Sequence, residues 1–365
     1  MKSTLQIAGS RPERRHVVTA AIVAIGVFVA IASTALAQRG AAPAAAATTP
    51  ADATARIVAS AQAVLATLDA TGKARVQFPT DGPQKTRWSN LPSPMFERQG
   101  LRLGDLTAAQ KTAVMNLLAV AFSKDGYQKV VEIMHGDEVL RTTNGGRGRG
   151  GAGGGPAFGE AEYYLAFVGT PSTSAPWMLQ FGGHHLAINL TMAGSQATMA
   201  PSLPAAQPAS YTVEGRTVRP LGRENDKAFA LINALDASQR TQAILAHTVS
   251  DLVLGPTQDG RTIQPEGIRA SALSNTQQTM LLDIVREWSG IMNDTFAEPR
   301  MSEIRSKLPD TWFAWSGPTT NGSAAYFRIQ GPTLVIEYAP QGGVEHIHTI
   351  YRDPTNDYGV KFARQ

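Results

Sequence analysis

The sequence contains no cysteine. This absence excludes disulfide bridges, thiolate nucleophiles, iron–sulfur clusters and cysteine-ligated zinc. The fold must therefore be stabilised by a packed core alone.

An excess of charge is also lacking. The formal net charge is +4, and the first 37 residues contribute four positive charges and one negative charge, so the rest of the chain carries about +1. No basic face with interleaved aromatic residues follows. We therefore expect neither a nucleic-acid partner nor binding to an anionic membrane surface.

Long hydrophobic runs are equally scarce, and the one present covers residues 17–31. Its length of about 15 residues is short of the roughly 20 that a membrane-spanning helix needs. A basic segment precedes it, and Ala35-Leu36-Ala37 follows in the small-x-small form that signal peptidase cleaves. We predict that residues 1–37 are a cleaved export signal and that the mature chain is periplasmic or secreted, with no membrane span. Arg14-Arg15 leaves the choice between the general and the twin-arginine export routes open.

Residues 38–54 form an Ala/Pro/Thr tract that is typical of a flexible tether. Beyond it the chain repeats itself: "ATLDATGKA" at 66–74 resembles "NALDASQRT" at 233–241, and "GDLTAAQKTAVMNLL" at 104–118 resembles "SALSNTQQTMLLDIV" at 271–285. Residues 163–183 also match 311–332, at a smaller displacement, because only the first copy carries the insert "RTTNGGRGRGGAGGGPAFGE" at 141–160. We predict a tandem duplication, with lobe 1 at 55–222, including this Gly-rich insert, and lobe 2 at 223–365.

The hydrophobic periodicity predicts an α+β fold of two tandem related lobes, each with helices followed by antiparallel β-hairpins. The clearest helix starts are Thr107 with Gln110 and Ser274 with Gln277, which have the form of capping boxes. We expect helices over residues 59–68, 107–122, 226–235, 238–253 and 275–292. We expect strands over residues 163–168, 177–181, 185–192 and 197–199 in lobe 1, and over 311–315, 324–330, 333–338 and 344–351 in lobe 2.

Four of the seven histidines fall in two short motifs. His184 and His185 lie in "QFGGHHLAINL", and His346 and His348 form a His-x-His pair. Residues two apart on a strand face the same side, so the second pair can present two imidazoles to one metal ion. Adjacent histidines point to opposite faces unless a bulge or turn intervenes, for which Gly182-Gly183 is suited.

These motifs suggest a mononuclear metal site, for zinc or another divalent ion, built from some of His184, His185, His346 and His348. Folding residues 333–338 back on 344–351 would set Glu337 opposite His346 or one residue away, as an oxygen ligand or base. The alternative is that these are sheet histidines, hydrogen-bonded to backbone or to neighbouring side chains.

Two further segments each allow two interpretations. Arg352 and Asp353 could bind a polar or anionic substrate or orient a histidine ring, or Asp353-Pro354 could simply end the strand in a turn. A proline-rich loop with Asp81, Arg87, Trp88 and Arg98 could form the rim of a pocket, or a structural strap over the helices.

Three separated motifs together resemble one protein family. "WSNLPSPMFERQG" at 88–100, "FGGHHLAIN" at 181–189 and "HIHTIYRDPTNDYG" at 346–359 are similar to exported bacterial proteins of the domain of unknown function 3500 family (DUF3500). The resemblance covers almost all of the chain after the tether, and it implies a fold grouping but no reaction. Family members usually carry an acidic residue before the proline that follows the histidine hairpin, whereas this chain has Gln207-Pro208 there.

Two functions remain open on the sequence. The first is an exported metal-dependent hydrolase that acts on a small-molecule or polymeric substrate, with Glu337, Arg352 and Asp353 as its catalytic residues. The second is a non-catalytic exported module that binds a ligand or a partner.

Overall fold

The computed structural model describes residues 49–143 and 155–362. The predicted export signal, residues 38–48 of the tether and residues 144–154 of the insert lie outside the described residues. The described helices are α1 (Pro50–Ala66), α2 (Ala70–Val76), α3 (Ala108–Ala121), α4 (Lys124–Thr143), α5 (Gly222–Ala234), α6 (Ala237–Ala243), α7 (Asn275–Ser289) and α8 (Asp294–Ser306).

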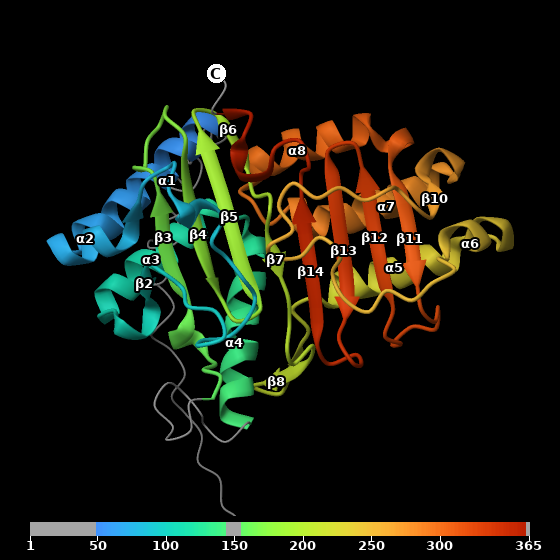
Figure 1. Ribbon diagram of the computed structural model, residues 1–365, viewed down its shortest axis with the longest axis horizontal. Helices are drawn as coiled ribbons and strands as arrows, with labels where there is room; N and C mark the ends of the chain where they lie inside the picture. The colour runs from blue at the N-terminus through green and yellow to red at the C-terminus, as the bar shows by residue number, and fades with distance from the viewer. Residues whose placement is uncertain (1–48, 144–154, 363–365) are drawn as a thin grey trace, which may run out of the picture. The chain divides into compact units, whose positions relative to one another are not determined.

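The strands form two main sheets and one small ribbon (Figure 1). The first sheet contains β1 (Gln77–Phe78), β2 (Leu101–Arg102), β3 (Tyr164–Val168), β4 (Trp177–Gly183), β5 (Leu186–Ala193), β6 (Gln196–Thr198) and β7 (Leu203–Pro204). The ribbon is β8 (Tyr211–Val213) with β9 (Arg216–Val218). The second sheet has the order β10 (Ile268–Arg269), β11 (Trp312–Ser316), β12 (Tyr326–Gly331), β13 (Leu334–Pro340), β14 (Ile347–Arg352). All pairings between the described strands are antiparallel except that of β1 with β3, so the predicted α+β class is confirmed.

The helix ends show which local signals were informative. Thr107 and Ser274 both cap their helices in capping boxes, as predicted. The helix expected over 238–253 was wrong beyond Ala243, because Ile244 bridges to Trp315 and the chain continues as an extended loop. His247 therefore lies in a loop rather than on a helix. The tether was predicted five residues too long, since a capping box at Thr49 starts α1 at Pro50.

Each main sheet packs one face against helices. The first core joins β3, β4 and β5 to α1, α3 and α4, and the second joins β11 to β14 with α5, α7 and α8. Each fully buried large apolar side chain contributes roughly 1.5–3 kcal/mol. A smaller cluster on the other face includes Trp88, Met178, Leu203, Ile350 and Tyr358. The segment with Trp88 thus crosses the sheet. Of its two interpretations, the strap over the helices was wrong, and Arg87, Trp88 and Arg98 instead line a pocket.

The two sheets are joined edge to edge by β7 and the residues around it. Leu203 pairs with Ala187 of β5, while Ser202 and Ala206 form bridges to Tyr351 and Ile347 of β14. Figure 1 accordingly shows β7 between β5 and β14. Strands from distant parts of the chain are therefore held side by side at this seam.

The pairings of β2 with β3 and of β10 with β11 occur at equivalent places in the two repeats: Leu101 pairs with Leu165, and Ile268 pairs with Phe313. The division into two duplicated lobes stays a prediction, and all described residues belong to one compact unit. In the part of the chain that the structure describes, no helix is long and apolar enough to cross a membrane.

Candidate metal centre

His184 and His185 form the two-residue turn of the hairpin between β4 and β5. The last pair of this hairpin is Gly183 with Leu186, and His185 adopts a left-handed conformation with φ of 60°. An L-residue other than glycine rarely adopts this conformation, and it turns the chain within two residues. As a result the two imidazoles do not point to opposite faces: their ring centroids lie 3.6 Å apart at 33°.

The seam between the sheets brings His185 to the His-x-His pair. Ala205 N–H donates to the carbonyl of His185, and the next residue, Ala206, exchanges two backbone hydrogen bonds with Ile347. Ile347 separates His346 from His348, whose side chains share one face of β14 because they are two residues apart. The backbone of residues 205–206 thus fixes the distance between the two histidine motifs.

Three imidazoles converge at this point. The Nε2 atom of His346 lies 2.9 Å from Nε2 of His185 and 3.0 Å from Nε2 of His348. One ligand atom from each of the three residues lies within 4.8 Å of the others, so His185, His346 and His348 could hold a metal ion. Nitrogen ligands about 2.0–2.1 Å from a tetrahedral zinc ion are separated by roughly 3.3 Å, which is close to these distances.

Hydrogen bonding alone accounts poorly for this arrangement. A neutral imidazole nitrogen carries either one N–H or one lone pair, so Nε2 of His346 cannot form two well-directed N–H···N bonds at once. A cation that accepts three lone pairs removes this conflict. The geometry therefore favours the metal interpretation over that of hydrogen-bonded sheet histidines.

The environment favours the neutral form of His185 and His346. Burial lowers the pKa of His185 well below its usual value, and the neighbouring histidines lower it further. Burial, followed by the charge of His348, lowers the pKa of His346 to about 4. Neutral imidazole is the form that binds a metal ion.

Polar side chains next to the cluster orient it. Asp251 accepts from Nδ1 of His348 at 3.3 Å, and its carboxylate is also held by the side-chain amide of Gln341 at 2.8 Å. A carboxylate on the far nitrogen of a metal-ligating histidine fixes the tautomer and raises its basicity. The Asn90 amide lies 3.2 Å from Nε2 of His348, and the Asn90 carbonyl accepts from the backbone N–H of His185.

His184 lies beside the cluster and makes a different contact. Its Nδ1 is 2.6 Å from Oδ1 of Asp137, and its ring packs against Phe158 with centroids 4.9 Å apart. The backbone carbonyl of His184 accepts from the buried hydroxyl of Tyr163 at 2.7 Å. By contrast, Nδ1 of His185 has no hydrogen-bond partner among residues 49–143 and 155–362. The His185 ring is thus held by the turn and by packing against the rings of His184, His346 and His348.

Glu337 lies away from the histidines, and its predicted pairing with His346 was wrong. The register of β13 with β14 sets Glu337 opposite Ile350, while the backbone of His346 pairs with Gln341. The carboxylate of Glu337 is fully buried and accepts from the backbone of residues 253–254 and from the hydroxyl of Tyr326. In this position it anchors the loop that carries Asp251.

Arg352 and Asp353 are likewise placed at the opposite end of β14. Arg352 is paired with Asp259 and Asp357, and it also donates to backbone carbonyls of the 254–255 loop. Asp353 accepts from the backbone N–H and the hydroxyl of Thr355 and pairs with Arg300. Strand β14 ends at Arg352, and the residues after it form a turn, as the second interpretation expected.

Sequence reasoning missed three residues at the site. Asp251 was missed because its segment was predicted as helix, and Asp137 because α4 was not among the helices whose bounds were predicted. Asn90 lies in the motif "WSNLPSPMFERQG", which was noted for its family resemblance but not for chemistry.

Comparison with known proteins places the chain in a family. A model described as "Protein of unknown function (DUF3500)" matches residues 50–360. The chain belongs to this family. No curated protein and no solved structure matched it.

Proposed function

We propose that this DUF3500 protein binds one divalent metal ion, with zinc as the preferred ion, through His185, His346 and His348. The observation that carries the proposal is the approach of three ring nitrogens from two distant motifs to a common point. His346 and His348 are partly exposed, so an ion can enter from solvent.

A three-histidine centre of this kind supports hydrolysis. Among the described residues no fourth histidine or carboxylate joins the group, which leaves one coordination position for water or substrate. A zinc ion held by three protein ligands supplies Lewis acidity and lowers the pKa of water. The chain's own residues would position the ion: Asp251 orients His348, and the Asn90 amide lies next to Nε2 of His348. We therefore propose an exported metal-dependent hydrolase that acts on a small polar substrate.

Metal analysis of protein purified without an affinity tag tests the first step. We expect about one zinc ion per chain, and loss of that ion in His346→Ala and in the milder His346→Gln. His135→Ala is the matched control, because His135 lies on α4, contacts Glu160 and Tyr211, and is not part of the histidine cluster. Folded His346 variants that retain a full equivalent of zinc would refute the site.

Hydrolysis of 4-nitrophenyl acetate, a generic activated ester, tests the second step. We expect a rate that depends on added zinc and is abolished by His348→Gln. A protein that binds zinc stoichiometrically yet gives the same rate with and without zinc would be a binding module rather than a hydrolase.

A further inference from the structure

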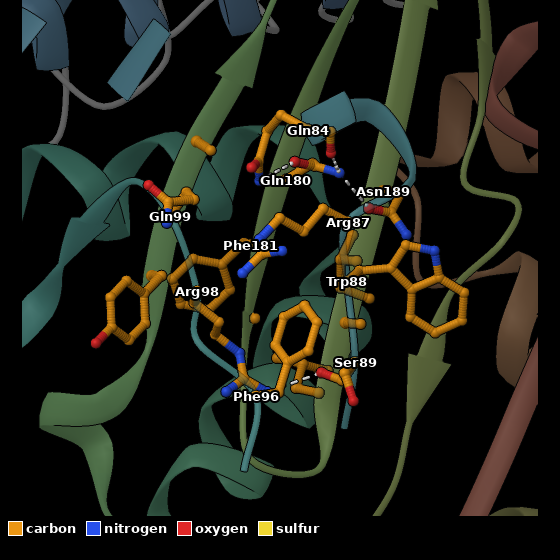
Figure 2. A pocket seen from close by; sticks show the side chains of 16 residues that line it. Gln84, Arg87, Trp88, Ser89, Phe96, Arg98, Gln99, Gln180, Phe181 and Asn189 are labelled. Atoms are coloured by element: carbon orange, nitrogen blue, oxygen red, sulfur yellow. Dashed lines mark hydrogen bonds between the residues drawn. The ribbon is translucent and has the colours of Figure 1, made fainter. Parts of the chain in front are cut away.

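A small cavity lies beside the histidine centre, on the face of the first sheet that is turned away from the helices. Its floor consists of side chains from β3, β4 and β5, including Tyr164, Gln180 and Asn189, and its roof is the segment 84–99 (Figure 2). The floor residues are neighbours in the sheet: Tyr164 pairs with Gly182, and Gln180 pairs with Asn189.

The cavity contains positive charge without a matching negative charge. Arg87 and Arg98 line it, and no aspartate or glutamate is among its described lining residues. Both guanidinium groups lie over the ring of Phe96, with centroid distances of 5.2 Å for Arg87 and 5.4 Å for Arg98 (Figure 2). In the described part of the chain neither arginine forms an ion pair with a carboxylate.

The protein uses only one nitrogen of each guanidinium. Nη2 of Arg87 donates to the carbonyl of Glu97, and Nη2 of Arg98 donates to the carbonyls of Ser89, Leu91 and Gly183. A guanidinium has five N–H donors in a fork that matches a carboxylate. Several donors therefore remain for a ligand.

The positive charge of Arg98 is partly buried and has no directly paired negative charge among the described residues. Burial lowers the pKa of Arg98 to about 10, although the more distant charges of Asp137 and Glu162 act in the opposite direction. Those two carboxylates are already paired, with His184 and Arg102 respectively. An anionic ligand would supply the missing counter-charge, since a half-buried cation is costly without one.

The other polar groups in the cavity are largely satisfied. The Gln84 amide donates to the Gln180 side chain, and the Gln180 amide donates to Asn189 (Figure 2). The Asn189 amide donates to the carbonyl of Pro201. Because these donors are used, the guanidinium groups dominate recognition. This favours an anion over a neutral polyol.

The size of the cavity selects among anions. Its volume is about 40 Å³. One water molecule needs roughly 10–15 Å³ of such space, so the cavity accommodates about three water-sized atoms, the number in a carboxylate group. A phosphate group is larger, and the remainder of any ligand would have to extend out of the mouth.

We propose that this cavity binds the carboxylate group of a small organic acid. The acid would lie next to the histidine centre for two reasons. Ser89 lines the cavity, and the adjacent Asn90 contacts His348. Arg98 also donates to the carbonyl of Gly183, which directly precedes His184. Binding in the cavity requires no metal ion, so it is separable from the proposed metal function.

Calorimetric titration of metal-free protein with propionate, lactate and benzoate tests this proposal. We expect at least one of these acids to bind, its matched neutral amide not to bind, and Arg87→Gln to weaken binding about tenfold. Arg87→Lys should retain part of the affinity because it keeps the charge. Arg75→Gln is the control, since Arg75 is exposed on α2 and does not line the cavity.

The outcomes separate this inference from the metal proposal. Carboxylate binding that persists in His346→Gln supports the cavity even if zinc binding fails. Equal affinity in Arg87→Gln and Arg75→Gln, or binding of inorganic phosphate but of none of the acids, would overturn the carboxylate assignment.

Discussion

At the scale of single residues, His185 and His346 meet although 161 positions separate them in the chain. A shared metal ion could be predicted from the sequence, because a His-x-His pair on a strand presents two imidazole rings to the same side. The sequence did not allow the partners of these histidines to be identified. The carboxylate that reaches His348 is determined by the register of β14 and by the path of the loop after α6. The register also differs from the predicted one by a few residues, so that Gln341 rather than Glu337 lies opposite His346.

The contact between Asp251 and His348 leads to a first prediction. Asp251→Asn removes the carboxylate that fixes the ring of His348, so we expect zinc affinity to fall about tenfold or more while the fold is kept. Competitive titration with a chromogenic chelator measures the affinity. Asp283→Asn, which changes an exposed aspartate on α7, should leave the affinity unchanged, and an equal loss in both variants would show that Asp251 has no specific role.

His184 gives a second prediction at this scale. Its Nδ1 is bonded to Asp137 rather than aimed at the other three rings, so we expect His184→Gln to retain the zinc stoichiometry and to lose stability instead. A buried hydrogen bond to a charged group contributes about 1.5–3 kcal/mol, which is measurable by urea unfolding. Loss of zinc from folded His184→Gln would instead make His184 a fourth ligand.

At the scale of elements, the tight turn between β4 and β5 sets the site.

Helices with strong caps, such as α3 and α7, were predictable from the sequence because the capping residues act locally. The bounds of the helix α4 were not predictable in this way, because α4 buries Lys129 and Asp137, and these two charged residues interrupt its apolar pattern. Lys129 is satisfied by Glu224 and Glu287 from other helices, a compensation that only the tertiary structure supplies.

The hairpin turn leads to a third prediction. A Cβ at Gly183 would come within 2.8 Å of the ring of Tyr163, and that ring cannot move freely because it is fully buried. Gly183→Ala should therefore destabilise the protein by about 1–3 kcal/mol and weaken zinc binding by displacing His185. Gly155→Ala meets no atom within 4 Å and serves as the control. Unchanged zinc affinity in Gly183→Ala would show that the turn does not set the site.

At the scale of the whole molecule, the centre takes ligands from both sheets. His185 comes from the first sheet and the His-x-His pair from the second, with residues 202–206 between them. Helices followed by strands indicated the α+β class, but this edge-to-edge seam was not predictable. It depends on single bridges such as Ala206 with Ile347, which leave no periodic pattern in the sequence.

This arrangement leads to a fourth prediction, for thermal unfolding. An ion bound only by the folded state adds about 2.7 kcal/mol when its free concentration is 100 times its dissociation constant. We expect zinc to raise the melting temperature, and hydrogen exchange to slow both at the β4–β5 turn and at the start of β14. Protection at only one of these two places would contradict a centre shared between the sheets.

The most direct measurement is X-ray absorption spectroscopy of the zinc-loaded protein. Our account predicts about three imidazole nitrogens at roughly 2.0–2.1 Å and one oxygen ligand, with the imidazole signal reduced by one ring in His185→Gln. A first shell dominated by oxygen, or one identical in the wild type and in His185→Gln, would contradict it.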